Sequence, residues 1–177
     1  MANWEFSSKV VLVTGSSSGI GAQIAQDFAK AGARVIVTGR RWEAIQKVVE
    51  ECNILSPNSV ENEAFGIAAD ITKIDKIKNL VGTVLERFGR LDILINCAGG
   101  GTFDGIHDDQ LVKKIEKMMN LNLRSVVAFT QAALPHLEAS KGNIVNIVSQ
   151  YATRPVSSNN NHDFFENTEK KCKQSMF

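Results

Sequence analysis

The chain has 177 residues, of which 44% are hydrophobic and 22% are charged, so one globular domain with a real core fits it better than two. Its formal net charge of +1 gives no electrostatic reason to expect a nucleic acid or an anionic membrane as a partner. The three cysteines are far apart and show no metal-ligand spacing, which favours reduced thiols and no metal site. The amino terminus does not resemble a signal peptide, and no apolar run could span a bilayer, so we expect a cytoplasmic protein.

Two hydrophobic periods alternate along the chain. Short apolar runs predict strands, and longer stretches with helical spacing predict the helices between them. The predicted strands are residues 9–14, 34–38, 64–69, 91–95 and 142–148, and the predicted helices are residues 20–31, 42–55, 73–88 and 109–137. The last helix should be bent or broken near Asn120 and Asn122. The alternation predicts an α/β fold with a Rossmann-like, doubly wound parallel sheet of strand order 3-2-1-4-5.

The alternating pattern stops after Ser149. A sheet of this class should continue with another helix and another strand, whereas residues 157–163 are polar and aperiodic. We therefore expect an incomplete sheet in a domain of residues 1–155, followed by a disordered or irregular polar tail of residues 156–177. The fifth strand should then be an exposed apolar edge. Four residues of the last helix should also be partly exposed, because the elements that would cover them are missing: Val126, Val127, Phe129 and Leu134.

A glycine-rich turn joins the first predicted strand to the first predicted helix. Its sequence, Thr-Gly-Ser-Ser-Ser-Gly-Ile-Gly over residues 14–21, places glycines at 15, 19 and 21 around Ser17 and Ser18. Glycines at such positions allow a positive φ, the close approach of a ligand and tight packing of helix on strand. The free N–H groups at the start of the helix then favour a pyrophosphate or phosphate. The alternative is a glycine-rich turn that binds nothing.

Two arginines follow the second predicted strand, where sites that select NAD usually carry an acidic residue. The planar guanidinium of Arg40 or Arg41 can pair with a 2′-phosphate, so the sequence favours NADP, with NAD as the alternative. Both arginines could instead be ordinary solvated residues. Asp70 ends the third strand and could accept a hydrogen bond from adenine or cap the next helix, a role for which Thr72 competes.

Three more motifs follow in order: Asn-Cys-Ala-Gly at 96–99, Asn-Leu-Asn at 120–122 and Asn-Ile-Val-Ser at 146–149. Together with the glycine-rich turn and Asp70, they resemble the short-chain dehydrogenase/reductase family over about residues 5–150. The resemblance implies an oxidoreductase that transfers hydride between a nicotinamide cofactor and a small carbonyl or alcohol substrate. It also implies a homo-oligomer, while the net charge gives no reason to expect a nucleic-acid or membrane partner.

The resemblance implies a role for individual residues of these motifs. Around the pyrophosphate it places Gly15, Ser17, Gly19 and Ile20, with Ser18 and Gly21 in the same turn. It places Asp70 at the adenine, and it assigns support of the fourth strand and the ribose to Asn96, Ala98 and Gly99. Asn122 would hold a water of the proton relay, and Ser149 would hydrogen-bond the substrate. Cys97 replaces a second asparagine of the family and is interpreted as a small buried hydrophobe.

The acid–base pair of the family is missing from the sequence. In the family a tyrosine exchanges the substrate proton, and a lysine four residues later lowers its pKa. The only tyrosine here, Tyr151, is followed four residues later by Pro155, which supplies no cation, and His162 is better interpreted as solvated than as a substitute base. We therefore expect a chain truncated after the serine strand, with impaired catalysis and a compromised oligomer interface. The alternatives are a non-catalytic nucleotide-binding fragment or variant, or a regulatory interaction module.

Overall fold

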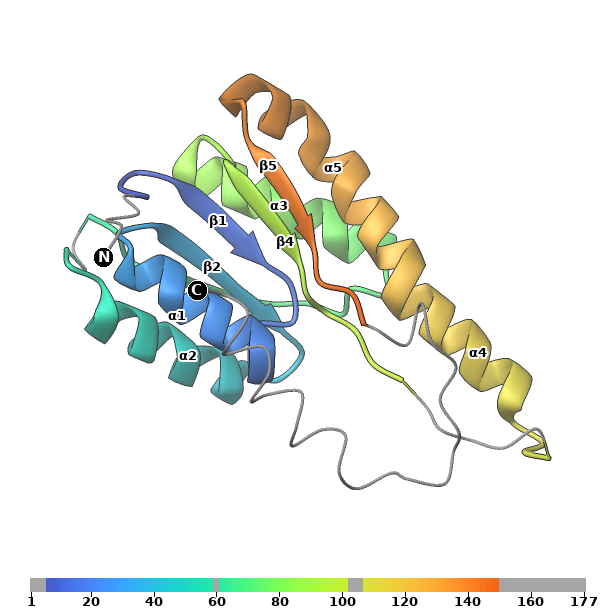
Figure 1. Cartoon of the computed structure of the whole chain (residues 1–177). Helices are drawn as coiled ribbons and strands as arrows, with labels where there is room; N and C mark the ends of the chain where they lie inside the picture. The colour runs from blue at the N-terminus through green and yellow to red at the C-terminus, as the bar shows by residue number, and fades with distance from the viewer. Residues whose placement is uncertain (1–5, 59–60, 102–106, 150–177) are drawn as a thin grey trace.

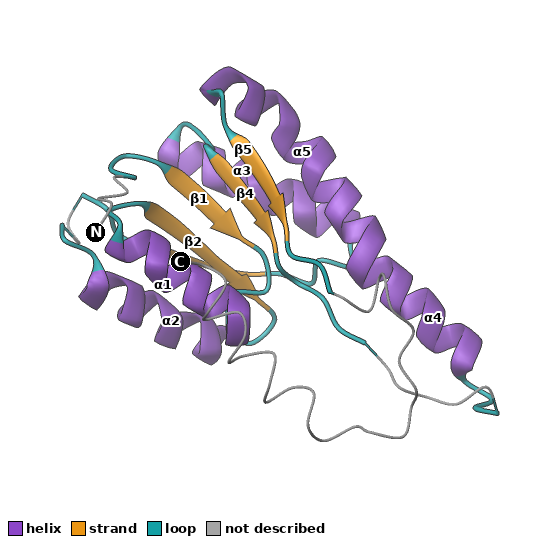
Figure 2. Ribbon diagram, in the orientation of Figure 1, coloured by secondary structure: helices purple, strands orange, loops and turns teal. Residues whose placement is uncertain are grey.

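The computed structural model describes residues 6–58, 61–101 and 107–149. Within these residues, five parallel strands form one sheet in the order β3-β2-β1-β4-β5 (Figures 1 and 2). The strands are β1 (Val10–Val13), β2 (Arg34–Gly39), β3 (Phe65–Ala68), β4 (Ile93–Asn96) and β5 (Asn143–Asn146). The helices are α1 (Gly19–Lys30), α2 (Trp42–Leu55), α3 (Ile74–Phe88), α4 (Leu111–Met119) and α5 (Ser125–Ser140). The predicted strand order and parallel pairing are confirmed.

Helices cover the sheet from both sides, α1 and α2 on one face and α3 and α5 on the other (Figure 2). Side chains alternate along a strand, so β1 sends Val11 and Val13 toward the first pair of helices and Val10 and Leu12 toward the second. All four side chains are fully buried. This double burial explains why the central strands are almost continuous apolar runs.

The long helix after β4 changes its winding where the sequence predicts an interruption. A π-helical turn, η1 (Asn120–Arg124), joins α4 to α5, and Figure 1 shows the three segments as one continuous helix. Such wide turns inside helices often accompany functional sites. No helix in the described part of the chain is long and apolar enough to cross a membrane.

A buried carboxylate ties the amino ends of β1 and β4 together. Asp92 is 2% exposed, and its oxygens accept hydrogen bonds from the Val10 N–H at 3.0 Å and from Arg90 Nε at 2.8 Å and Nη2 at 2.6 Å. Lys9 Nζ adds an ion pair at 3.2 Å. Burial raises the pKa of Asp92, but the hydrogen bonds from Arg90, Val10 and Lys9 outweigh burial, so this pKa lies below its usual value.

Replacement of Asp92 by asparagine should lower the free energy of unfolding by about 1–3 kcal/mol at pH 7, because the charge-assisted bonds are lost. The folded pKa is depressed, so the contribution of Asp92 is complete above the unfolded pKa of about 3.9 and fades as the pH falls toward the folded pKa. Urea unfolding between pH 7 and pH 3 measures both effects. Asp109→Asn, at an exposed position, is the control. An unchanged acid dependence in Asp92→Asn would contradict this account.

β5 is an exposed edge of the described sheet, as the sequence predicts. Val145 on β5 is 43% exposed, and Ile147 and Val148, just after the strand, are 39% and 82% exposed. On α5, Val127 and Leu134 are also exposed, but the expectation for Phe129 is wrong, since its side chain is only 1% exposed. Val127 and Leu134 are seven residues apart on the outer face of α5, whereas Phe129 points at the sheet and packs in the same cluster as Leu94. Val126 is half-buried.

We expect the purified chain to self-associate as its concentration rises, because an uncharged apolar edge offers unpaired N–H and C=O groups to another chain. Val145→Lys should reduce the self-association, since a charge on the edge opposes pairing. Sedimentation and binding of a dye for exposed apolar surface measure the effect. A monodisperse monomer with a cooperative melt and no dye binding would contradict the prediction and mean that another segment, such as Phe164 and Phe165, covers β5.

Candidate functional site

The predicted site residues gather at the carboxyl edge of the sheet, toward which all the drawn arrowheads point (Figure 2). Gly15 and Gly19 have φ of +66° and +58°, as the tight turn after β1 requires. A Cβ on Gly15 would lie 2.7 Å from Ala98 Cα, and one on Gly21 would lie 2.6 Å from the Gly15 carbonyl oxygen. Nothing lies within 4 Å of the corresponding point at Gly19. Gly15 and Gly21 therefore serve close packing, while Gly19 leaves open space at the helix start.

Two hydroxyl groups that received no role from the sequence hold this turn in place. Thr14 is 2% exposed, and its Oγ1 accepts hydrogen bonds from the N–H groups of Cys97 and Ala98, both at 3.0 Å. Ser16 is fully buried, and its Oγ donates to the Val13 carbonyl at 2.6 Å and accepts from the Thr38 N–H at 2.9 Å. The turn after β1 is thus bound to both neighbouring strands. The only sequence signal for these roles of Thr14 and Ser16 was that both residues flank Gly15 at the end of a predicted strand.

The start of α1 is open to an anion. Ser18 occupies the N-cap position with extended backbone, yet its side chain makes no capping hydrogen bond. Ser18, Gly19 and Ile20 are all exposed. A helix start with exposed N–H groups and no side-chain cap favours a phosphate, because the helix dipole is positive there. Ser17 lies against the end of β2, where a Cβ on Gly39 would be 2.5 Å from its Oγ.

Both arginines after β2 are exposed at the same edge of the sheet. Asp70 is also exposed, and its Oδ1 accepts hydrogen bonds from Thr72 Oγ1 at 2.7 Å and from the Thr72 N–H at 3.1 Å. These two bonds lower the pKa of Asp70, with smaller contributions from the charges of Lys73 and Arg40. The N-cap position of α3 belongs to Lys73, which has no side-chain cap, so neither Asp70 nor Thr72 fills it.

The turn after β4 is anchored to β5. Asn96 is 3% exposed, its Nδ2 donates to Asn146 Oδ1 at 2.9 Å, and its carbonyl accepts from the Ile147 N–H at 2.9 Å. Ser149 lies two residues after Ile147 and is exposed at the same edge of the sheet. Ala98 is half-buried and Gly99 exposed, whereas Cys97 is half-buried and packs against the cluster beneath α1 and α2.

Asn122 joins η1 to the turn after β4. Its Nδ2 donates to the Gly100 carbonyl at 2.7 Å, and its Oδ1 accepts from the Gly100 N–H at 3.0 Å. The side-chain amide is therefore a positioning contact between the π-helical turn and this loop, a role that no sequence pattern indicated. Its part in a proton relay stays a prediction. Tyr151, Pro155 and His162 lie outside the described residues, as does the expected tail of residues 156–177.

Cys52 does not belong to this site. It lies on the buried face of α2 and is fully buried, and burial, with a smaller contribution from the charge of Glu51, raises the pKa of its thiol to about 12. The thiol is therefore protonated and unreactive at neutral pH.

Comparisons with known proteins agree with this geometry. The short chain dehydrogenase family model matches residues 9–161. The 11-beta-hydroxysteroid dehydrogenase A of Sesamum indicum is 34% identical over 153 residues, which are 86% of this chain and 42% of that protein. The chain spans about half the length of the curated relatives it matches.

Two solved structures are similar to most of the chain. One is a 7 alpha-hydroxysteroid dehydrogenase complexed with NADH and 7-oxo glycochenodeoxycholic acid, at 28% identity and a TM-score of 0.79, with coverage of 97% of this chain and 64% of that one. The other is a metagenomic short-chain oxidoreductase in complex with NADP, at 32% identity and a TM-score of 0.76, with coverage of 89% and 68%. The glycine-rich turn, the sheet and the extent of the family match lead to one conclusion: the chain belongs to the short-chain dehydrogenase family.

Proposed function

We propose that this chain binds a nicotinamide dinucleotide at the carboxyl edge of its sheet and prefers NADP to NAD. The observation that carries the proposal is the uncapped, exposed start of α1, which lies at the same edge as the arginine pair at the end of β2. The N–H groups of Gly19 and Ile20 would meet the pyrophosphate, and the open space at Gly19 lets a ligand approach the backbone. When bound, the cofactor donates or accepts a hydride.

The preference for NADP rests on the arginines. Arg40 follows β2 and Asp70 follows β3, and these strands pair at their ends, Gly39 with Ala68, so the two residues leave the sheet at neighbouring positions. A guanidinium fork there suits a 2′-phosphate. The solved relatives described above include one bound to NADP and one bound to NADH, so family membership alone leaves the choice open. Selection of NAD usually depends on an acidic residue after β2 that hydrogen-bonds the ribose 2′-hydroxyl.

The bound substrate would be a small carbonyl or alcohol compound. Ser149 would hydrogen-bond its oxygen, while Asn96 and Asn146 fix the end of β5 that leads to Ser149. The sequence offers no tyrosine with a lysine four residues later to exchange the proton. We therefore favour a nucleotide-binding chain with impaired turnover, and a non-catalytic or regulatory member of the family is the second candidate.

The arginines can be tested by nucleotide binding alone. Calorimetry should show that the chain binds 2′,5′-ADP about 10–100-fold more tightly than 5′-AMP, the effect of one or two charge-assisted hydrogen bonds. Arg40→Asp combined with Arg41→Ala should remove the difference. Lys30→Ala removes a cation from the far end of α1 and should leave it intact. Equal affinity of the unchanged chain for the two nucleotides would refute the NADP preference.

Turnover should be near background, because loss of general acid–base help costs roughly 10²–10⁴ in rate. The measurement is NADPH oxidation by the purified chain over a panel of carbonyl substrates. A chimera with a family segment containing Tyr-x-x-x-Lys after Ser149 is the positive control and should regain activity. Rapid oxidation by the unchanged chain would show that another group transfers the proton.

A further inference from the structure

The glycine-rich turn occupies the space that a side chain would need at the end of β2. Gly39 is the last residue of this strand, and a Cβ built on it would lie 2.5 Å from Ser17 Oγ and 2.8 Å from Ser17 Cβ. The next neighbour, Ile45 Cγ1, is 3.7 Å away, which is an ordinary van der Waals distance. The φ of Gly39 is not positive, so the contact with Ser17, and not the backbone conformation, excludes a side chain there.

Rotation of the Ser17 side chain does not remove this conflict. A different χ1 rotamer moves Oγ, but Cβ stays where the backbone puts it, 2.8 Å from the added atom. The backbone is held beside both residues, because the Ser16 N–H donates to the Thr38 carbonyl at 3.0 Å and Ser16 Oγ accepts from the Thr38 N–H at 2.9 Å. A side chain at position 39 would therefore push the turn away from β2 and strain these two hydrogen bonds.

Position 39 is also a place from which a side chain would reach the nucleotide. Alternate residues of β2 face the same side of the sheet, so a side chain at position 39 would follow Val35 and Val37 toward the layer of α1 and α2. It would emerge beside the glycine-rich turn, at the carboxyl edge of the sheet. Sites that select NAD place a carboxylate about 20 residues after this turn, where it hydrogen-bonds the ribose 2′-hydroxyl. Position 39 matches that placement.

We propose that Ser17 is a specificity-determining residue of the nucleotide site proposed above, on which this inference rests. Its Cβ and Oγ exclude a carboxylate from the end of β2, so Arg40 and Arg41 meet the nucleotide without an acidic side chain at position 39 and favour a 2′-phosphate. The preference then depends on the contact between the turn after β1 and the end of β2, in addition to the arginines. A change toward NAD requires two substitutions: Ser17→Gly, which opens the space, and Gly39→Asp, which fills it with a carboxylate.

Urea unfolding of the full chain tests the contact. Gly39→Ala should lower the midpoint of unfolding most with Ser17 in place, less with Ser17→Ala, which keeps Cβ, and least with Ser17→Gly. Gly66→Ala is the matched control, because Gly66 lies on β3 without a positive φ and its added Cβ would meet Ile45 Cγ2 at 2.6 Å. The loss caused by Gly66→Ala should therefore be the same in all three backgrounds. Equal losses from Gly39→Ala in the three backgrounds would overturn the proposal.

Calorimetry with 2′,5′-ADP and 5′-AMP tests the specificity. Ser17→Gly alone should keep the preference for 2′,5′-ADP, because the arginines remain. In the Ser17→Gly, Gly39→Asp chain the ratio of the two affinities should fall by about tenfold or more, since a carboxylate repels the 2′-phosphate and accepts a hydrogen bond from a 2′-hydroxyl. Gly39→Asp with Ser17 in place should bind both nucleotides more weakly, because the displaced turn no longer presents the start of α1 to the 5′-phosphate.

The outcomes distinguish the role of Ser17 from the NADP preference itself. If Gly39→Asp alone is as stable as the Ser17→Gly, Gly39→Asp chain and binds 5′-AMP as tightly, the role of Ser17 is overturned while the arginines keep theirs. Loss of the preference in Ser17→Gly alone, or an unchanged ratio in the double variant, would also overturn it. Equal affinity of the unchanged chain for the two nucleotides would overturn the NADP preference together with the role of Ser17.

Discussion

The hydroxyl of Thr14 is the contact on which the candidate site depends. It accepts hydrogen bonds from two backbone N–H groups in the turn after β4. The absence of a side chain on Gly15 lets the turn after β1 pack closely against the turn after β4. Ser16 makes the corresponding connection to β2. The glycine-rich turn is thus held from both sides before any ligand binds, and this preorganisation keeps the exposed start of α1 in place.

The sheet carries polar anchors at both of its ends and apolar packing between them. At the amino ends, Asp92 accepts hydrogen bonds from Val10 and Arg90, and at the carboxyl ends the Asn96–Asn146 pair joins β4 to β5. Between them, both faces of β1 are buried in the two helix layers. The charged network around Asp92 therefore lies at the edge of the sheet opposite the candidate site.

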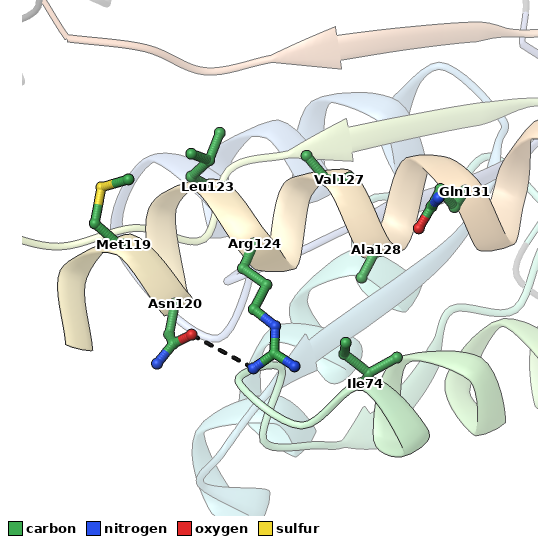
Figure 3. A pocket seen from close by; sticks show the side chains of 8 residues that line it. All are labelled: Ile74, Met119, Asn120, Leu123, Arg124, Val127, Ala128 and Gln131. Atoms are coloured by element: carbon green, nitrogen blue, oxygen red, sulfur yellow. Dashed lines mark hydrogen bonds between the residues drawn. The ribbon is translucent and has the colours of Figure 1, made fainter. Parts of the chain in front are cut away.

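Two apolar surfaces are exposed in the described part of the chain: the edge strand β5, and a shallow groove between α3 and α5 that includes Ile74, Ala128 and Gln131 (Figure 3). They differ in charge: Lys78 and Arg124 line the groove, whereas β5 offers uncharged backbone and aliphatic side chains.

Local periodicity and turn chemistry in the sequence determined the strands, the helices, the glycine-rich turn and the interruption near Asn120, because each depends on neighbouring residues. The chain order of the motifs also indicated the family and the carboxyl edge as the site. Only the tertiary structure decided what Thr14, Ser16 and Asn122 do, since the partners through which they join other elements lie 22 to 84 residues away. It also decided that Phe129 faces the sheet while Val127 does not, and it brought α3 and α5 together into a groove. Such contacts depend on how elements pack in three dimensions, and a hydrophobic pattern read along one element does not contain that information.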